Sequence, residues 1–386
     1  MKKKDYHELA LYSMCRPYRP GVINREKLMQ GLRENFTSEE LQLFLMFSWT
    51  EAPLTPEKLA KKAKKEKFSD QSIQEILAKL LKENMIGELD EPGVGKVYSR
   101  CDFLTIAISQ VRAGQPGALQ EACAEFIVDS VEKHGMGLDN KTPVYRVVPV
   151  QNTLVRESDI KKIDVNRKIP DPRAVLPVDI VTELIKKEPF ISVSDCWCRT
   201  AMKFADKGCH HPLETCFGFG RLGRIAVEAG LGREIDYEEA CQILKKTEKE
   251  GLIHSVDNAE GGLEALCACC SCSCLVIRSM MRNETNVGAP ARFMAVTDQD
   301  ECKLCGTCEE ICHVDAITIS NQKKTTDEHK CIGCGLCVSG CPEGACCMTP
   351  REKYPKIHRD AEAIYSKVGR EVIVGMIKNK VLGVGQ

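Results

Sequence analysis

The chain has 386 residues and balanced charge, with 54 basic and 55 acidic side chains and a formal net charge of −1. Proteins that bind polyanions usually carry a basic excess, and aromatic residues, on which bases could stack, make up only 5%. The composition therefore does not favour a nucleic-acid-binding protein, and the length allows about two to four compact domains.

The first residues, MKKKDYHELALYSMC, begin with three lysines, as a secretory signal peptide can. Asp5, His7 and Glu8 then interrupt the apolar segment that such a peptide requires. No uninterrupted apolar run approaches the ~18–20 residues of a transmembrane helix. We therefore expect a soluble, cytoplasmic protein.

The N-terminal third contains signals for three helices. Residues 37–49 begin with Thr37 and Glu40, the pair that forms a capping box. Residues 55–66 open with a threonine N-cap and a proline at the first helical position. Residues 70–83 repeat isoleucine and leucine at helical spacing, which predicts one apolar face.

A β-hairpin is predicted next, in MIGELDEPGVGKVYSR, with its turn around Gly93 and Gly95. Three helices and a hairpin over residues 30–103 resemble a winged helix–turn–helix. In that fold the third helix reads DNA bases, but here its first turns are acidic, with Asp70 at the start. The lysines of EKLAKKAKKEK lie on the second helix and predict a solvated face. We therefore expect this module to dock a protein, with DNA binding as the alternative.

Cysteine is the most unusual feature of the composition, with 23 residues. Three lie in the first 195 residues, ten lie between positions 196 and 274, and ten lie between positions 302 and 347. Many cysteines in a short secreted chain would suggest disulfides. In a long chain without a signal peptide, metal or redox clusters are the better interpretation.

Two cysteine runs share one spacing. Residues 302–312 read CKLCGTCEEIC and residues 331–342 read CIGCGLCVSGCP, so each contains C-x2-C-x2-C-x3-C. In such a loop three thiolates can converge on one cubane, and Gly306, Gly333 and Gly335 permit the backbone angles that this needs. A pair of zinc ribbons would instead use C-x2-C hairpins spaced apart. The spacing therefore favours [4Fe–4S] clusters.

These runs resemble the bacterial-type ferredoxin with two [4Fe–4S] clusters, over residues 296–350. By that resemblance, the fourth cysteine of each run binds the cluster of the other run. One ligand set would then be Cys302, Cys305, Cys308 and Cys341. The other would be Cys331, Cys334, Cys337 and Cys312.

The ferredoxin-like segment also has features outside this spacing. His313 stands where the resemblance expects a proline; it could replace a ligand, but four thiolates are already present. We expect NQKKTTDEH, between the two runs, to be a polar loop. Cys346 and Cys347 follow the second run, and we expect them to pack beside a cluster without binding it.

Nine further cysteines fall in two bursts, within residues 195–217 and in CACCSCSC at 267–274. They are Cys196, Cys198, Cys209, Cys216, Cys267, Cys269, Cys270, Cys272 and Cys274. Reduced thiols at this density would oxidise or scavenge metal unless they were committed to a site. Arg199 and Lys207 could offset thiolate charge, whereas the isolated Cys241 is expected to be a packing residue.

Residues 143–350 resemble a group of iron–sulfur proteins of anaerobic bacteria and archaea. These proteins combine a C-x-C-R segment, a dense C-x-C-C-x-C segment and a two-cluster ferredoxin domain, and the resemblance implies electron transfer without naming a substrate. Ser273 stands where they often have another cysteine. Two further cubanes would use eight of the nine thiols; one cubane, or a zinc or other non-cubane site, are the alternatives. His210 and His211 are expected at the surface or beside ligands, with a ligand role as the alternative.

GFGRLG, at residues 218–223, satisfies the G-x-G-x-x-G pattern of dinucleotide-binding loops. That fingerprint requires a strand directly before it and a helix after it. A helix is plausible, but HHPLETC with Pro212 does not predict a strand. We therefore expect a glycine-rich loop that lets the backbone approach a cluster, and no nucleotide site.

The remaining elements complete an α+β multidomain chain. We expect a helix at 118–134, a strand at 144–150, and a helix, glycine stop and strand across 236–256. The predicted parts are an N-terminal segment (1–29), the winged-helix-like module (30–103), a helical linker (104–142), a cysteine-rich iron–sulfur domain (143–295), the two-[4Fe–4S] ferredoxin domain (296–350) and a helical tail (351–386).

The tail from residue 355 is basic and then apolar, and we expect it to dock on this chain or on a partner; peripheral membrane contact is the alternative.

The leading hypothesis is a multi-cluster iron–sulfur electron-transfer protein, the relay subunit of an anaerobic oxidoreductase with redox partner proteins. A reductase with a substrate-binding cluster in the middle domain and a redox-sensing DNA-binding regulator are the alternatives. No catalytic residue is identified, so whether the chain is itself an enzyme stays open.

Overall fold

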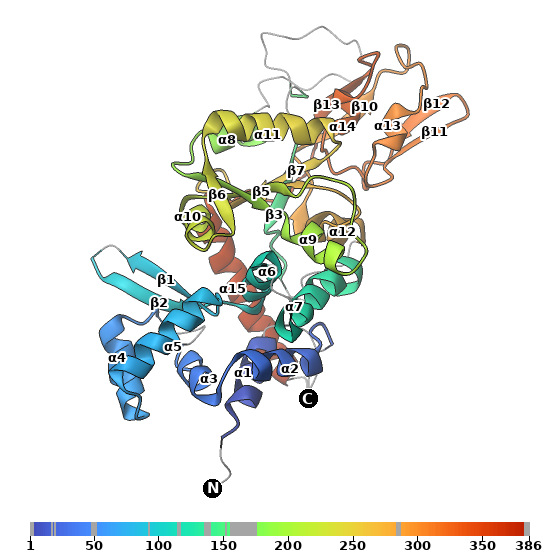
Figure 1. Ribbon diagram of the computed structural model, residues 1–386. Coiled ribbons are helices and arrows are strands. Elements are labelled where there is room, and N and C mark those ends of the chain that lie inside the picture. The colour runs from blue at the N-terminus through green and yellow to red at the C-terminus, as the bar shows by residue number, and fades with distance from the viewer. Residues whose placement is uncertain are drawn as a thin grey trace. The chain divides into compact units, whose positions relative to one another are not determined.

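The computed structural model describes most of the chain as two compact units (Figure 1). The first unit runs to Ser130 and includes Thr200–Lys207, and the second comprises Val131–Arg199 and Gly208–Val384. The described residues are 4–16, 18, 21–47, 52–91, 93–113, 117–134, 140–150, 153–154, 176–282 and 287–381.

The first unit is mostly helical. Its helices are α1 (Tyr6–Cys15), α2 (Arg25–Asn35), α3 (Ser38–Phe44), α4 (Pro56–Lys65), α5 (Asp70–Lys82), α6 (Phe103–Ala113) and α7 (Ala118–Asp129). The hairpin of β1 (Ile86–Glu91) and β2 (Gly95–Arg100) stands between α5 and α6. The helix predicted at 118–134 is confirmed, because α7 continues into a π-helical turn at Ser130–His134.

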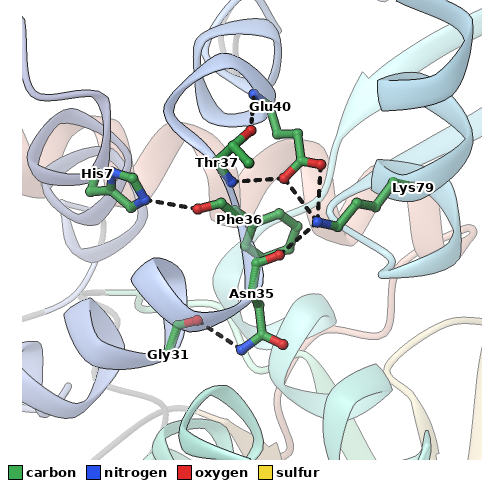
Figure 2. A network of polar contacts seen from close by, with 7 residues as sticks. All are labelled: His7, Gly31, Asn35, Phe36, Thr37, Glu40 and Lys79. Atoms are coloured by element: carbon green, nitrogen blue, oxygen red, sulfur yellow. Dashed lines mark hydrogen bonds and ion pairs between the residues drawn. The ribbon is translucent and has the colours of Figure 1, made fainter. Parts of the chain in front are cut away.

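The start of α3 carries the predicted capping box. The Thr37 hydroxyl accepts from the Glu40 amide, and the Glu40 carboxylate accepts from the Thr37 amide (Figure 2). Lys79 of α5 donates to the same carboxylate at 2.8 Å and to the Asn35 carbonyl at 2.7 Å, so one ion pair joins two helices. The helix ends at Phe44, earlier than predicted, and residues 48–49 lie outside the described residues.

The next elements agree with the sequence patterns. Thr55 caps α4 with a proline in its first turn, and α5 buries Ile73, Ile76 and Leu80. The predicted hairpin is confirmed, with six residue pairs between its strands and the left-handed Gly93 in its turn. Left-handed backbone is accessible to glycine at little cost, which is why the turn forms there.

The helical layer formed by α2, α6 and α7 is closed by aromatic packing. Tyr18 meets the Phe126 ring edge-on at a centroid distance of 5.3 Å, and Phe103 packs against Phe126 at 5.0 Å. A Cβ on Gly31 of α2 would lie 2.5 Å from the Cα of Leu119, so only glycine allows these helices to approach this closely.

The second unit is built on a seven-stranded sheet with the order β6-β4-β5-β8-β7-β3-β9. Its strands are β3 (Tyr145–Val148), β4 (Ile191–Asp195), β5 (Glu214–Phe219), β6 (Gly232–Ile235), β7 (Ile253–Asp257), β8 (Ala265–Cys269) and β9 (Gly288–Ala289). All neighbours pair antiparallel except β3 and β9. The predicted strand at 144–150 and the helix, glycine stop and strand at 236–256 are confirmed as β3, α11 (Tyr237–Lys249), Gly251 and β7.

Alternation along the strands divides side chains between two faces of the sheet. On one face, Ile253, Cys267 and Cys269 pack with α12 (Leu275–Arg282) and with the ferredoxin-like segment in one core. On the other, Leu266 and its neighbours pack against α8 (Val181–Ile185), α11 and α15 (Ala361–Val381). Figure 1 shows α8 and α11 together over this face.

The glycine motif at 218–223 has a different role from the predicted one. The expectation that no strand precedes it is wrong: β5 begins after Pro212 and runs into α10 (Gly220–Glu228). However, β5 is antiparallel to both neighbours, whereas dinucleotide-binding folds use parallel strands. A Cβ on Gly223 would lie 2.7 Å from the Gly218 carbonyl oxygen, so these glycines pack α10 against β5.

The ferredoxin-like segment has two small antiparallel pairs and two short helices. They are β10 (Phe293–Thr297) with β13 (Cys346–Pro350), β11 (Ile317–Ser320) with β12 (Lys323–Thr326), α13 (Thr307–Glu310) and α14 (Leu336–Ser339). The predicted polar loop NQKKTTDEH is therefore wrong in its first half, which forms a hairpin. Asn321 and Gln322 both have left-handed backbone, as a two-residue hairpin turn of type I′ requires.

The C-terminal tail docks on its own unit. Helix α15 buries Ala361, Ile364 and Val368, and its Glu371 carboxylate accepts from the Thr142 hydroxyl at 2.8 Å. Residues 382–386 lie outside the described part of the chain. Among the described helices, none combines the length and apolar character needed to cross a membrane.

Candidate metal centres

Two cavities lie inside the ferredoxin-like segment, of similar size at about 320 and 360 Å³ including space open to solvent. The first is lined by Cys302, Cys305, Cys308 and Cys341. The second is lined by Cys312, Cys331, Cys334 and Cys337. Each cavity thus gathers three cysteines of one run and the fourth cysteine of the other, which are the two sets the resemblance implied.

The turns that present these thiols depend on glycine and on close backbone packing. Gly306 and Gly335 stand in left-handed conformation directly before α13 and α14. Gly333 is more constrained, since its φ is +73° and a Cβ there would lie 2.0 Å from the Phe293 carbonyl oxygen. The second cysteine loop therefore lies directly against β10.

The chemistry of the donors fits [4Fe–4S] clusters. Each cavity offers at least four thiols, and thiolates are the usual ligands of these clusters. Around the second cavity, burial raises the pKa of the Cys334 thiol to about 12, so an unliganded thiol there stays protonated. Binding iron as thiolate would offset this cost of ionisation.

Residues 301–345 match the family described as the 4Fe-4S dicluster domain. This segment therefore binds [4Fe–4S] clusters. No curated protein and no solved structure matches the chain. The iron–sulfur character of the C-terminal segment thus rests on the family match together with the two four-cysteine cavities.

The dicluster domain contains a buried cation that the sequence analysis missed. Lys324 of β12 is only 1% exposed, lines the first cavity and donates to the Cys346 thiol at 2.8 Å. Burial opposes its charge, but Cys346 and nearby thiols hold the pKa of Lys324 above its ordinary value. Alternation of β12 could have indicated an inward lysine if the segment had been interpreted as a strand.

Of the two cysteines after the second run, Cys346 lines the first cavity and Cys347 lines neither cavity. Cys347 pairs with Val296 across the β10–β13 ladder, as a packing residue would.

Both ring nitrogens of His313 have partners: Nδ1 lies 2.9 Å from the Ser271 hydroxyl and Nε2 lies 2.6 Å from the Gly251 carbonyl oxygen. A ligand role for His313 is therefore not supported.

The nine middle cysteines form two separate groups. The thiol-rich group has six members with linked contacts: Cys196, Cys198, Cys216, Cys267, Cys269 and Cys274. The three-thiol group is Cys209, Cys270 and Cys272, whose sulfurs all lie within 4.8 Å of one another. The sequence could not divide these thiols, but the structure does.

The division follows from strand alternation and the end of β8. Cys267 and Cys269 point to the face shared with the dicluster domain, whereas Ala268 points to the other face. Cys270 lies just beyond β8 and packs with Ala268, Cys209 and Cys272. Cys269 and Cys270, adjacent at the end of β8, thus contribute to different groups.

Hydrogen bonds and one arginine set the charge of these thiols. A hydrogen bond from Cys198 lowers the pKa of Cys274, and a hydrogen bond from Cys272 lowers that of Cys270 to about 5. The buried Arg199 guanidinium donates to the Cys270 sulfur at 3.8 Å and to the Ala268 carbonyl at 3.1 Å. Arg199 therefore offsets thiolate charge, as the sequence predicted.

Three other predicted positions are placed as follows. Cys241 is half-buried in α11 and packs against the α8–α11 face of the sheet, away from both groups. His210 is exposed and its ring lies 4.6 Å from that of His211. Nδ1 of His211 is buried and has no hydrogen-bond partner among the described residues.

Proposed function

We propose that this chain is an intracellular multi-cluster electron-transfer protein and serves as the relay subunit of an anaerobic oxidoreductase. The observation that carries the proposal is the pair of four-cysteine cavities within the segment that matches the 4Fe-4S dicluster domain. When bound, such clusters take up and release single electrons at potentials that depend on burial, net charge and hydrogen bonds to sulfur.

The proposed ligands are the cysteines that line each cavity. Cys302, Cys305, Cys308 and Cys341 would hold one cluster, and Cys312, Cys331, Cys334 and Cys337 would hold the other. Cys308, Cys331 and Cys337 are buried, whereas Cys305 is exposed and leaves one edge of the first site open. That edge is the side from which we expect an external redox partner to approach.

We assign one further [4Fe–4S] cluster to the thiol-rich group. Its six thiols exceed the four that a cubane requires, and all but Cys267 are buried. Cys269 and Cys274 pack in the same core as Cys308, Cys331 and Cys337 of the dicluster domain. A shared core supports a relay, because it holds the thiol-rich group and the dicluster domain in one packed unit.

The proposed domain plan follows the predicted boundaries, with a winged-helix-like module at 30–103. Its helices and hairpin occur in the required order, but Asp70 at the start of α5 is paired with Lys64 at 3.0 Å. A recognition helix would need basic or neutral donors there to approach phosphates and bases. We therefore propose a protein-docking role for this module.

The test is the iron and acid-labile sulfide content of the full chain after anaerobic purification. Two clusters in the dicluster domain and one in the thiol-rich group give about 12 of each per chain, by the cluster formula. Replacing Cys308 by serine should lower both values by ~4. Cys347→Ser is the matched control, since Cys347 lines neither cavity and should leave both values unchanged.

The outcomes separate the candidate functions. A content of about 8 iron atoms per chain would show that the thiol-rich group holds no cluster. An unchanged iron content in the Cys308→Ser variant would overturn the ligand assignment. A reductase would require a small molecule that alters the spectrum of one cluster. No such molecule is expected to do so if the chain is only a relay.

A further inference from the structure

The three-thiol group differs in geometry from the cavities of the dicluster domain. The sulfurs of Cys209, Cys270 and Cys272 all lie within 4.8 Å of one another, and those of Cys209 and Cys270 are 3.9 Å apart. Across the described residues, no cysteine of the dicluster domain belongs to so tight a group. The three thiols thus converge on a point, whereas the cluster cysteines surround a space.

The spacing of the sulfurs fits a single metal ion. Zinc binds thiolates at about 2.3 Å in tetrahedral geometry, which places neighbouring sulfurs ~3.8 Å apart. A cubane instead takes each thiolate on a different iron, so its ligands must stand around the whole cluster. Cys216 and Cys267 of the thiol-rich group are also 3.9 Å apart, but among the described residues only Cys209, Cys270 and Cys272 form a triplet of mutually close sulfurs, and this triplet favours a mononuclear site.

The candidate fourth donor is His211, two residues after Cys209, although neither of its ring nitrogens lies within 4.8 Å of all three sulfurs. Nδ1 of His211 is buried from solvent without a hydrogen-bond partner among the described residues, and a buried polar atom of this kind is costly. Of the other imidazoles near His211, His210 is exposed and His313 uses both ring nitrogens in hydrogen bonds.

Groups around the three thiols would support bound thiolates. The Ser273 hydroxyl donates to the Cys209 sulfur at 3.6 Å, and Arg199 donates to the Cys270 sulfur at 3.8 Å. Ser273 and Arg199 are 0% and 2% exposed, so both contacts are shielded from water. Hydrogen bonds to ligand sulfurs orient them and reduce their negative charge.

We propose that Cys209, Cys270 and Cys272 bind one divalent metal ion, with zinc as the best chemical match, and that His211 turns toward the three sulfurs to complete a Cys₃His site. Zinc favours this donor set in sites that stabilise structure. The site joins the loop after α9 (Trp197–Phe204) to the end of β8, close to the thiol-rich group. It is a site for a single redox-inactive ion, additional to the clusters of the proposed relay.

The test combines metal analysis with X-ray absorption at the zinc edge on the anaerobically purified full chain. We expect one zinc per chain, with three sulfur ligands at about 2.3 Å and one nitrogen ligand at about 2.0–2.1 Å. The zinc edge is not obscured by the iron clusters. No zinc, or zinc bound by four sulfurs, would overturn the proposal.

Variants then identify the ligands. Cys272→Ser should lose the zinc and keep the iron and sulfide of the parent chain, while Cys241→Ser, at a half-buried thiol outside the group, should keep all three. His211→Ala should lose the nitrogen ligand and weaken zinc binding more than ~100-fold, since losing only a hydrogen-bond partner of a ligand costs about 10–100-fold.

The competing assignment gives a different result. If Cys272→Ser instead lost ~4 iron and ~4 sulfide, the group would be a cubane site and the proposal would fail. If that variant did not fold, X-ray absorption at the zinc edge of the unaltered protein would still show whether zinc is bound and by which ligands. The iron content expected for three clusters, found together with one zinc, would support both the proposed function and this zinc site. The same iron content without zinc would support the proposed function and contradict the zinc site.

Discussion

At the scale of single residues, Lys324 is the clearest case of a side chain whose environment bears on function. It is buried beside the first four-cysteine cavity, with its ammonium group 2.8 Å from the Cys346 sulfur. A positive charge held in this position favours the added electron on a reduced cluster, because it lowers the energy of negative charge nearby.

Replacing Lys324 by methionine should therefore lower the reduction potential of that cluster. The expected shift is on the order of 60 mV, which corresponds to about 1.4 kcal/mol for one electron. Potentiometric titration followed by electron paramagnetic resonance measures it. Lys323→Met, on the exposed side of the same strand, is the control. Equal potentials in both variants would show that Lys324 has no electrostatic role.

Asp257 is a buried carboxyl that should make stability depend on pH. It accepts from the amides of Glu264 and Ala265 at 2.6 and 2.8 Å, and burial raises its pKa to about 7. The neighbouring titratable groups are Arg146, Tyr145, Glu264 and Tyr365. Because the folded-state pKa is raised, the stabilisation present at low pH is lost as pH rises through about 7.

The free energy of unfolding of the second unit should thus fall by about 2 kcal/mol between pH ~5.5 and ~8. Asp257→Asn should remove most of this fall, since the amide does not titrate. Thermal unfolding at several pH values, followed by circular dichroism, provides the measurement. The same pH dependence in both proteins would assign it to other groups.

At the scale of elements, the entry to α3 shows how local hydrogen bonds define a helix. Thr37 and Glu40 satisfy each other's backbone amides, and Lys79 joins the pair to α5 (Figure 2). Thr37→Ala should lower the free energy of unfolding of the first unit by ~1 kcal/mol, a usual cost for a lost N-cap. Urea denaturation measures it, and Ser38→Ala at the next, exposed position should stay within about 0.5 kcal/mol of the parent.

The second cysteine loop depends on a glycine for steric reasons. A Cβ at Gly333 would overlap the Phe293 carbonyl oxygen, so Gly333→Ala should displace the loop and remove ~4 iron and ~4 sulfide. Gly344→Ala is the matched control, because Gly344 has a left-handed φ of +66° but nothing within 4 Å of an added Cβ. If the Gly333→Ala variant kept the iron content of the parent protein, the loop would be shown to accommodate the added Cβ.

At the scale of the whole molecule, the two units differ in what holds their cores together. The second unit packs cysteines of the thiol-rich group and the dicluster domain into one apolar core. The first unit has an ordinary core around Phe103 and Phe126, and its three cysteines up to position 130 are well separated in sequence. Metal should therefore stabilise the second unit far more than the first.

Anaerobic removal of iron with a chelator should expose the second unit to protease while residues up to about 130 stay protected. Limited proteolysis followed by mass spectrometry of the fragments tests this. Simultaneous loss of protection in both units would mean that the first unit depends on the second for its stability.

The sequence by itself determined what depends on neighbours along the chain. The C-x2-C-x2-C-x3-C spacing selected eight of the nine cysteines that line the two cavities, and Thr37 and Thr55 marked helix starts, because turns and caps form within a few residues. Tertiary structure alone decided the division of the nine middle thiols. Cys209 meets Cys270 across 61 positions, and Cys269, the last residue of β8, and Cys270, just beyond it, join different groups. Such long-range packing has no local signature, whereas Lys324 was missed because its strand was interpreted as a loop.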